Sequence, residues 1–220
     1  MPDSVLSRSP ALLDASGAAA LVASYAAVSK TAAIKDIGRI DVHMARFIGL
    51  SPICLVSTAD KAGQQDVTPR GDPPGTFKVI DEHTIALADR PGNNRLDTLK
   101  NLIENPEIAL IFLLPGVAET VRVAGTARLS VDPELLASMA VQGKEPKCAI
   151  VVSVRQAYLH CAKALLRSRL WSPDYVQPKG SFPSIARMIG DQVGLSEDEK
   201  KAREALTEIA YRDGLWAPIT

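Results

Sequence analysis

The stretch EIALIFLLPGVAETVRVAGTARLS, residues 107–130, determines the fold that this sequence predicts. Residues 107–114 are almost entirely apolar and predict a buried strand, whereas residues 115–119 contain the Pro-Gly pair of a turn. Residues 120–130 continue as a second strand, in which Arg122 alternates with valines and faces away from them. Two strands joined by so short a turn pair antiparallel, so we expect an antiparallel sheet here.

Further strands are expected on both sides of this pair. They share short β-branched and apolar runs with turn residues between them, and they occupy residues 53–60, 65–72, 73–81, 84–90 and 148–161. Regular short strands of this kind favour an antiparallel barrel or sandwich.

One segment interrupts the strands, DRPGNNRLDTLKNLIENP at residues 89–106. Its leucines recur at helical spacing, which predicts a helix that ends at Asn105-Pro106. Asn94 is the expected N-cap, and Asp97 suits the positive dipole of the first turn.

The ends of the chain are predicted to be helical. Residues 10–50 form helices that Pro52 stops, and the last helix opens with a capping box from Ser196 to Glu199 and stops at Gly214. We expect an N-terminal helical extension packed on the barrel over residues 1–50, the barrel itself over 51–175, and a C-terminal helical segment over 176–220.

Composition narrows the function classes. The chain has 220 residues, 46% of them hydrophobic, and its 25 basic residues balance 25 acidic ones, which argues against a nucleic-acid binder. Its three cysteines form no CxxC pair, so we expect reduced thiols in the cytoplasm and no metal site. The apolar segment 11–28 contains Asp14, Ser and Gly, and we expect neither a secretory signal nor a membrane span there.

The turn at residues 89–95 is a candidate anion site. The free N–H groups at a helix start attract phosphate, and Gly92 allows a close approach of the backbone. Asp89, Arg90, Asn93, Asn94 and Arg95 are its candidate residues. The alternative is an ordinary surface turn with solvated arginines.

Other cations have similar alternatives. Arg70 is either a ligand or the ion-pair partner of Asp72 at a strand end. Arg122 on its strand faces solvent or meets an anion or a ring. Lys163 and Arg167 lie on one face of a predicted helix. They either belong to the candidate pocket or form an ordinary solvent-exposed basic stripe. These residues indicate a barrel-like domain with a candidate anion pocket but specify no reaction.

Several motifs together resemble the pyridoxamine-5′-phosphate-oxidase-like FMN-binding proteins. They are DVTPRGDPPG (66–75), LADRPGNNRLDTLKNLIENPEIALIFLLPG (87–116), ETVRVAGTARL (119–129) and HCAKALLRSRLW (160–171). The resemblance covers about residues 35–175 and is greatest to a bacterial branch of uncharacterised flavoproteins. It implies an α+β fold, an antiparallel split β-barrel with flanking helices and an N-terminal helical extension. It also implies a homodimer with shared FMN sites.

The resemblance also implies which residues bind the cofactor. Asn94 and Arg95 would hold the FMN phosphate with Arg70 nearby, and Thr120, Arg122 or Trp171 would reach the ring from the partner subunit. The full set is Arg70, Asp89, Arg90, Asn93, Asn94, Arg95, Thr120, Arg122, Lys163, Ser168, Arg169 and Trp171. No catalytic side chain is implied.

The sequence departs from the true oxidase in two motifs. The oxidase has an RxxLLK strand and an SRKA turn, where this chain has TPRGD and NNRLD. The resemblance therefore implies flavin binding rather than vitamin B6 oxidation. We expect an FMN-dependent oxidoreductase with an unidentified substrate and electron donor. The alternatives are a flavin carrier or sensor without turnover, and a haem-binding split barrel with His43, His83 or His160 as axial ligand.

Overall fold

The computed structural model describes residues 11–216, and the contacts within the chain divide it after Lys35 into two units. The first unit contains α1 (Ala15–Ala23) and α2 (Lys30–Ile34), and neither of these described helices buries a side chain. The division of the chain at residues 50 and 175 stays a prediction.

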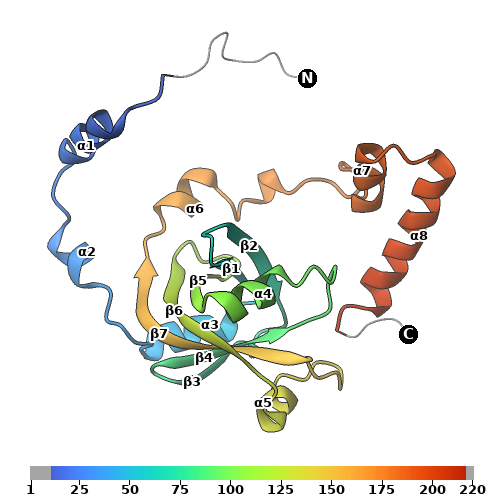
Figure 1. The fold of residues 1–220 in the computed structure, drawn as a ribbon, viewed down its shortest axis with the longest axis horizontal. Coiled ribbons are helices and arrows are strands. Elements are labelled where there is room, and N and C mark those ends of the chain that lie inside the picture. Colours follow the sequence, from blue (N-terminus) through green and yellow to red (C-terminus); the bar gives the residue numbers. More distant parts are fainter. Residues whose placement is uncertain (1–10, 217–220) are drawn as a thin grey trace. The chain divides into compact units, whose positions relative to one another are not determined.

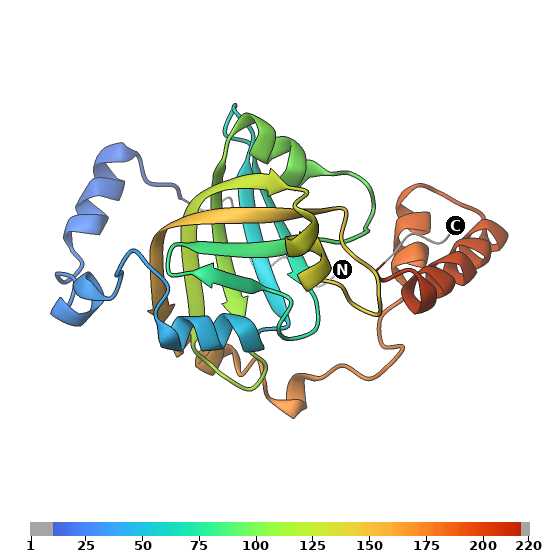
Figure 2. The same ribbon diagram turned by 90° about the horizontal axis from the view of Figure 1, so that it is seen from below.

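The second unit is built on a seven-stranded antiparallel sheet with the order β2-β1-β5-β6-β7-β4-β3. The sheet is strongly curved, but β2 and β3 remain as two edges and it is not closed (Figure 2). An α+β split barrel is thereby confirmed. Its strands are β1 (Ile53–Ala59), β2 (Gln65–Gly71), β3 (Lys78–Asp81), β4 (Thr84–Asp89), β5 (Glu107–Leu113), β6 (Thr120–Ser130) and β7 (Cys148–His160).

The other helices of this unit come before, between and after the strands in the chain (Figure 1). They are α3 (Val42–Leu50), α4 (Asp97–Glu104), α5 (Pro133–Ser138), α6 (Lys163–Ser168), a 3₁₀ turn (Pro173–Tyr175), α7 (Ile185–Gln192) and α8 (Glu197–Asp213). Among the described residues we find no helix with the length and apolar character that a membrane span requires.

The core lies on the inner face of the curved sheet. Alternate residues of β1 point inward, so that Cys54 and Val56 are buried while their neighbours are partly exposed. Helix α3 adds Met44, Phe47 and Ile48 to the same cluster. Burial of such side chains stabilises the fold by about 1.5–3 kcal/mol each.

Strands β6 and β7 form the longest ladder, and its register shifts between Ala124 and Gly125. A Cβ atom at Gly125 would lie 1.9 Å from the carbonyl oxygen of Ser153. Only glycine therefore allows β7 to come this close to β6 at the shift.

Helix α4 begins later than predicted, and the assignment of Asn94 as its N-cap is wrong. The N-cap position is Leu96, which has a left-handed backbone with φ 61° and no capping hydrogen bond from a described side chain. The physical reason is a turn before the helix, where the Asn93 side chain accepts the N–H of Arg95 at 3.0 Å. The predicted end at Asn105 is confirmed.

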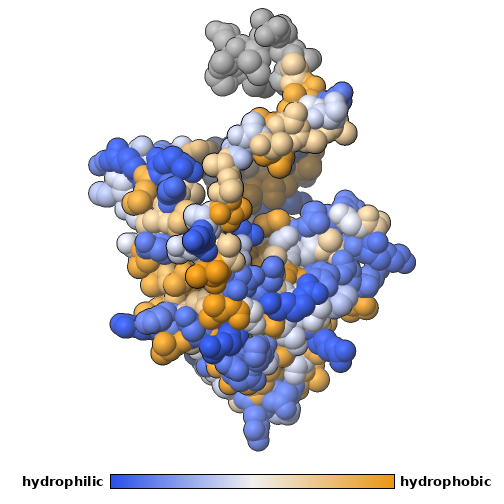
Figure 3. Space-filling view, turned by 90° about the vertical axis from the view of Figure 1, so that its left-hand side faces the viewer, coloured by the Kyte–Doolittle hydropathy of each residue, from blue (hydrophilic) through white to orange (hydrophobic). Residues whose placement is uncertain are grey.

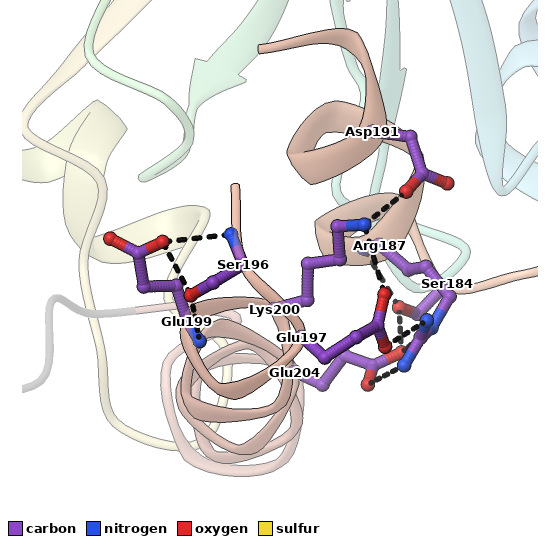
Figure 4. A network of polar contacts seen from close by, with 8 residues as sticks. All are labelled: Ser184, Arg187, Asp191, Ser196, Glu197, Glu199, Lys200 and Glu204. Carbon is purple, nitrogen blue, oxygen red and sulfur yellow. Dashed lines mark hydrogen bonds and ion pairs between the residues drawn. The ribbon is translucent and has the colours of Figure 1, made fainter. Parts of the chain in front are cut away.

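The C-terminal helices form a hairpin joined by charged side chains (Figure 4). Arg187 of α7 donates to Glu197 and Glu204 of α8, and Lys200 of α8 pairs with Asp191 of α7 at 2.6 Å. The predicted capping box from Ser196 and the predicted stop at Gly214 are both confirmed.

The surface keeps many apolar side chains, and Figure 3 shows them in patches between charged residues on the face it draws. Val67 on β2 and Leu159 on β7 belong to the outward-facing residues, with 66% and 44% of their surface exposed. Patches of this kind mark surfaces that can bind a partner.

Candidate functional site

A pocket of about 700 Å³ lies beside β2, the loop after β4 and the first turn of α4. Six of the residues predicted for the cofactor line this pocket. They are Arg70, Asp89, Arg90, Asn93, Asn94 and Arg95. The structure therefore brings together the two segments for which the resemblance implies phosphate binding.

These segments meet because the sheet is strongly curved, since β2 and β4 are not paired with each other (Figure 2). Arg70 pairs with Cys54 across β2 and β1, and its side chain points to the same side as those of Asp66 and Thr68. Asp89 at the end of β4 pairs with Cys148 at the start of β7. The loop from residue 90 to α4 then closes the pocket between them.

Two partly buried ion pairs lie in the wall of the pocket. Arg70 Nη1 lies 2.8 Å from Asp89 Oδ1, and Arg90 Nε lies 2.9 Å from Asp72 Oδ2. The alternative in which Arg70 pairs with Asp72 is therefore wrong, because Asp89 is the carboxylate that β4 places opposite it. The Nε atom of Arg70 is buried and has no hydrogen-bond partner among the described residues.

All three guanidinium nitrogens of Arg90 donate hydrogen bonds within the wall of the pocket. Its other guanidinium nitrogens donate to the carbonyl oxygens of Met139 at 2.6 Å and Lys144 at 3.3 Å. Trp216 Nε1 donates to the second carboxylate oxygen of Asp72 at 3.0 Å. Because each nitrogen of Arg90 has an acceptor, this residue positions the loop between α5 and β7.

The start of α4 opens onto the pocket without a side-chain cap. Residues 96–99 line the pocket, and the first hydrogen bond of the helix runs from Lys100 N to Leu96 O. The N–H groups before Lys100 therefore carry the positive end of the helix dipole toward the pocket. Asn94 and Leu96 both have positive φ, 58° and 61°, a strained backbone of the kind that gathers at ligand sites.

Cys148 also lines the pocket and is half-buried. Burial raises the pKa of its thiol, the nearby Asp89 carboxylate raises it further, and Arg70 opposes both effects. The thiol therefore stays protonated near neutral pH and acts as a small neutral wall of the pocket.

Arg122 lies on the opposite, outer face of the sheet. Its guanidinium carbon is 5.5 Å from the centre of the Tyr158 ring. Of the alternatives that the sequence left open for Arg122, contact with an aromatic ring is therefore the one observed. The two residues line a smaller hollow of about 290 Å³ together with Leu55, Ala109 and Ile111.

The other predicted residues also lie outside the pocket. Thr120 is buried at the start of β6, and Ser168 ends α6, which begins at Lys163. Arg169 pairs with Asp174, and its guanidinium lies 5.1 Å from the Tyr175 ring centre. Trp171 Nε1 donates to the carbonyl oxygen of Val117 at 2.8 Å. A single chain thus assembles half of the predicted set.

Sequence reasoning missed several residues that line the pocket, among them Asp66, Thr98, Lys147, Cys148 and Leu215. Lys147 and Cys148 reach it only because β7 pairs with β4. No local motif marks these two positions, so only the pairing of the strands could have found them.

A family comparison agrees with this architecture. The family model described as Pyridoxamine 5'-phosphate oxidase matches residues 40–161, which is more than half of the chain. The chain belongs to the pyridoxamine 5'-phosphate oxidase family. Members of this family generally bind a flavin and are commonly dimeric.

The haem alternative named His43, His83 or His160 as axial ligand. All three histidines lie within the described residues, and none of them lines the pocket.

Several solved structures are similar to this chain. HupZ of Group A Streptococcus has 18% identity and a TM-score of 0.46 over 55% of this chain and 93% of its own. A putative pyridoxamine 5'-phosphate oxidase of Lactobacillus delbrueckii has 15% identity and a TM-score of 0.44 over 57% of this chain and 99% of its own. The conserved hypothetical protein Rv2991 of Mycobacterium tuberculosis has 17% identity and a TM-score of 0.43 over 66% of this chain and 96% of its own. The comparison with curated proteins gave no match.

Proposed function

We propose that the pocket beside α4 binds FMN and that the protein is an FMN-dependent oxidoreductase acting on a small molecule. The observation that carries the proposal is the buried Nε of Arg70, which lacks an acceptor in a pocket that also receives an uncapped helix start. A buried donor without a partner costs about 1–3 kcal/mol, and a phosphate oxygen would remove this cost. The family, whose members generally bind a flavin, supplies the rest of the argument.

The residues of the pocket fit a flavin phosphate. Arg70, the backbone of the first turn of α4, Asn94 and Arg95 would hold it, and a volume of about 700 Å³ is in the range of cofactor sites. Arg70 keeps its place because Asp89 holds its other end. The flavin, when bound, supplies the electron-transfer chemistry, so that no acid–base pair of side chains is required.

A homodimer is part of the same proposal. Thr120, Arg122, Lys163, Ser168, Arg169 and Trp171 lie away from the pocket of their own chain. In a dimer, the partner subunit's Arg122 or the partner subunit's Trp171 would reach the flavin ring. The exposed apolar side chains around the outer hollow support an interface on that face.

A cytoplasmic location is also proposed. All three cysteines are free, although Cys161 is exposed. Exposed free thiols persist in a reducing compartment.

Spectroscopy of the purified protein tests the proposal. We expect flavin absorbance bands, FMN as the ligand released on denaturation and identified by mass spectrometry, and renewed binding when FMN is added to the stripped protein. A colourless protein that does not take up FMN would contradict the proposal, and a Soret band would show haem instead. Reduction of the bound flavin by NADH or NADPH, with transfer to an acceptor, distinguishes an enzyme from an inert carrier.

Arg70→Lys gives this test a residue-level readout. Lysine keeps the charge beside Asp89 but removes the Nε donor, so we expect the dissociation constant for FMN to rise about tenfold. The matched control is Arg46→Lys on the exposed side of α3, for which we expect no change. An unchanged affinity of Arg70→Lys would separate Arg70 from the phosphate site.

A further inference from the structure

The charges that line the pocket beside α4 are almost all neutralised. Its wall contains the cations Arg70, Arg90, Arg95 and Lys147 and the carboxylates Asp66, Asp72, Asp89 and Asp97. The two sets are equal in number. A phosphate dianion that enters this pocket therefore meets little net positive charge unless one of the cations is uncommitted.

Each of the three arginines already has a carboxylate partner. Arg70 pairs with Asp89 and Arg90 with Asp72, both in mostly buried pairs. Arg95 pairs with Asp97 at 2.7 Å on the exposed rim, where it is mostly solvated. Lys147 is the cation of this wall for which the described residues provide no ion pair.

The backbone at Lys147 is held firmly although its side chain is exposed. Lys147 directly precedes Cys148, which pairs with Asp89 at the end of the β4–β7 ladder. Arg90, the next residue after Asp89, holds the chain just before Lys147 through the carbonyl oxygens of Met139 and Lys144. The ammonium group is therefore tethered at the pocket wall and still free to turn toward a ligand.

We propose that Lys147 is a phosphate-recognition residue of this pocket and makes it prefer FMN to riboflavin. The inference rests on the proposed function, because it assigns a further residue to the same flavin site. An ammonium group is a compact charge that binds phosphate oxygens from many directions. Lys147 supplies a positive charge that no carboxylate balances, in addition to the Nε donor of Arg70, whose charge Asp89 already balances.

Riboflavin provides the decisive comparison because it differs from FMN only in lacking the phosphate. We would measure the dissociation constants of both flavins by quenching of flavin fluorescence, for the wild type and for Lys147→Gln. The matched control is Lys144→Gln, since Lys144 is a nearby exposed lysine that does not line the pocket. Glutamine keeps most of the side-chain length and removes the charge.

We expect Lys147→Gln to weaken FMN binding about tenfold, which corresponds to one charge-assisted hydrogen bond. Riboflavin binding should not change, and Lys144→Gln should leave both flavins unaffected. Lys147→Arg, which restores the charge, should bind FMN with an affinity close to that of the wild type.

Three outcomes would overturn the inference. Unchanged FMN affinity in Lys147→Gln would remove Lys147 from the phosphate site while the proposed function stands. Equal losses for FMN and riboflavin would assign Lys147 a merely structural role. A wild type that binds neither flavin would overturn the proposed function itself, and this result is seen before any variant is measured.

Discussion

Cys54 lies on β1 opposite Arg70 of β2 and Phe112 of β5, and none of its surface is exposed. Burial strongly raises the pKa of its thiol, although the backbone at Ile111 and the charge of Arg70 act in the opposite direction. The thiolate is thus much less stable in the folded protein than in the unfolded chain. The folded state therefore binds the thiol proton more tightly than the unfolded state does.

This difference gives a prediction about alkaline pH. The folded pKa is raised, so the contribution of Cys54 to stability is fully present below the ordinary thiol value of 9.0 and is lost as pH rises above it. Above about pH 9, the free energy of unfolding of the wild type should fall more steeply than that of Cys54→Ala, by about 1.4 kcal/mol per pH unit. Urea unfolding at several pH values measures both slopes, and equal slopes would contradict the prediction.

At the scale of single residues, the sequence predicted which residues line the pocket better than it predicted their ion-pair partners. Arg70 and the 89–95 turn were found from a strand-end motif and a helix start, which are local features. Which carboxylate each arginine meets depends on how the curved sheet brings distant strands together, and this places Asp89 rather than Asp72 beside Arg70. Lys147 escaped notice for the same reason, since only the β4–β7 pairing brings it to the pocket.

The shift in register at Gly125 shapes the two longest strands. Beyond this position β7 continues to His160, opposite Thr120 of β6. The close approach of Gly125 to the carbonyl oxygen of Ser153 involves backbone on both sides, so no side chain can move away to relieve a clash. The position therefore depends on the absence of a Cβ atom.

We predict that Gly125→Ala destabilises the protein by about 3 kcal/mol or more, because the added Cβ atom forces two backbones apart. Gly49→Ala is the control, since a Cβ there meets nothing within 4 Å in α3 and should stabilise the fold by about 0.8 kcal/mol. Thermal unfolding of both variants measures the effects. A Gly125→Ala variant as stable as the wild type would show that the ladder can relax.

Elements with a strong pattern were predicted within a residue or two of their observed ends. The strands over 53–59, 65–71, 107–113 and 120–130 follow directly from alternation and turn residues. The expected strand over residues 73–81 is shorter, Lys78–Asp81, because Pro73 and Pro74 cannot donate to a ladder. The Asn94 cap failed because Asn93 forms a competing turn, which periodicity does not reveal.

At the scale of the whole molecule, the order of the strands in the sheet could not be predicted from local sequence patterns. Short turns predict that β5 meets β6, but nothing local pairs β1 with β5 or β4 with β7. The family resemblance implied a split barrel but no particular strand pairing. The half of the predicted set that lies away from the pocket would join it only in the proposed dimer, which the sequence indicates only through the resemblance.

The proposed dimer gives a prediction at this scale. Ala109 is exposed beside the outer hollow, so Ala109→Glu should leave the monomer folded but place unpaired charges in the interface. Sedimentation should give the wild type twice the 23.5 kDa mass of the chain and the variant close to that mass. Ala137→Glu, exposed on α5, should remain dimeric. A monomeric wild type, or a dimeric Ala109→Glu, would contradict the proposed interface.

The open sheet has two edges, and their chemistry affects how the protein aggregates. Edge strand β2 contains Pro69, which has no amide hydrogen to offer to an incoming strand. The other edge, β3, is only four residues long and contains Lys78 and Asp81. Neither edge is therefore a good template for strand addition. We expect the native protein to resist growth into β-ladders or fibrils.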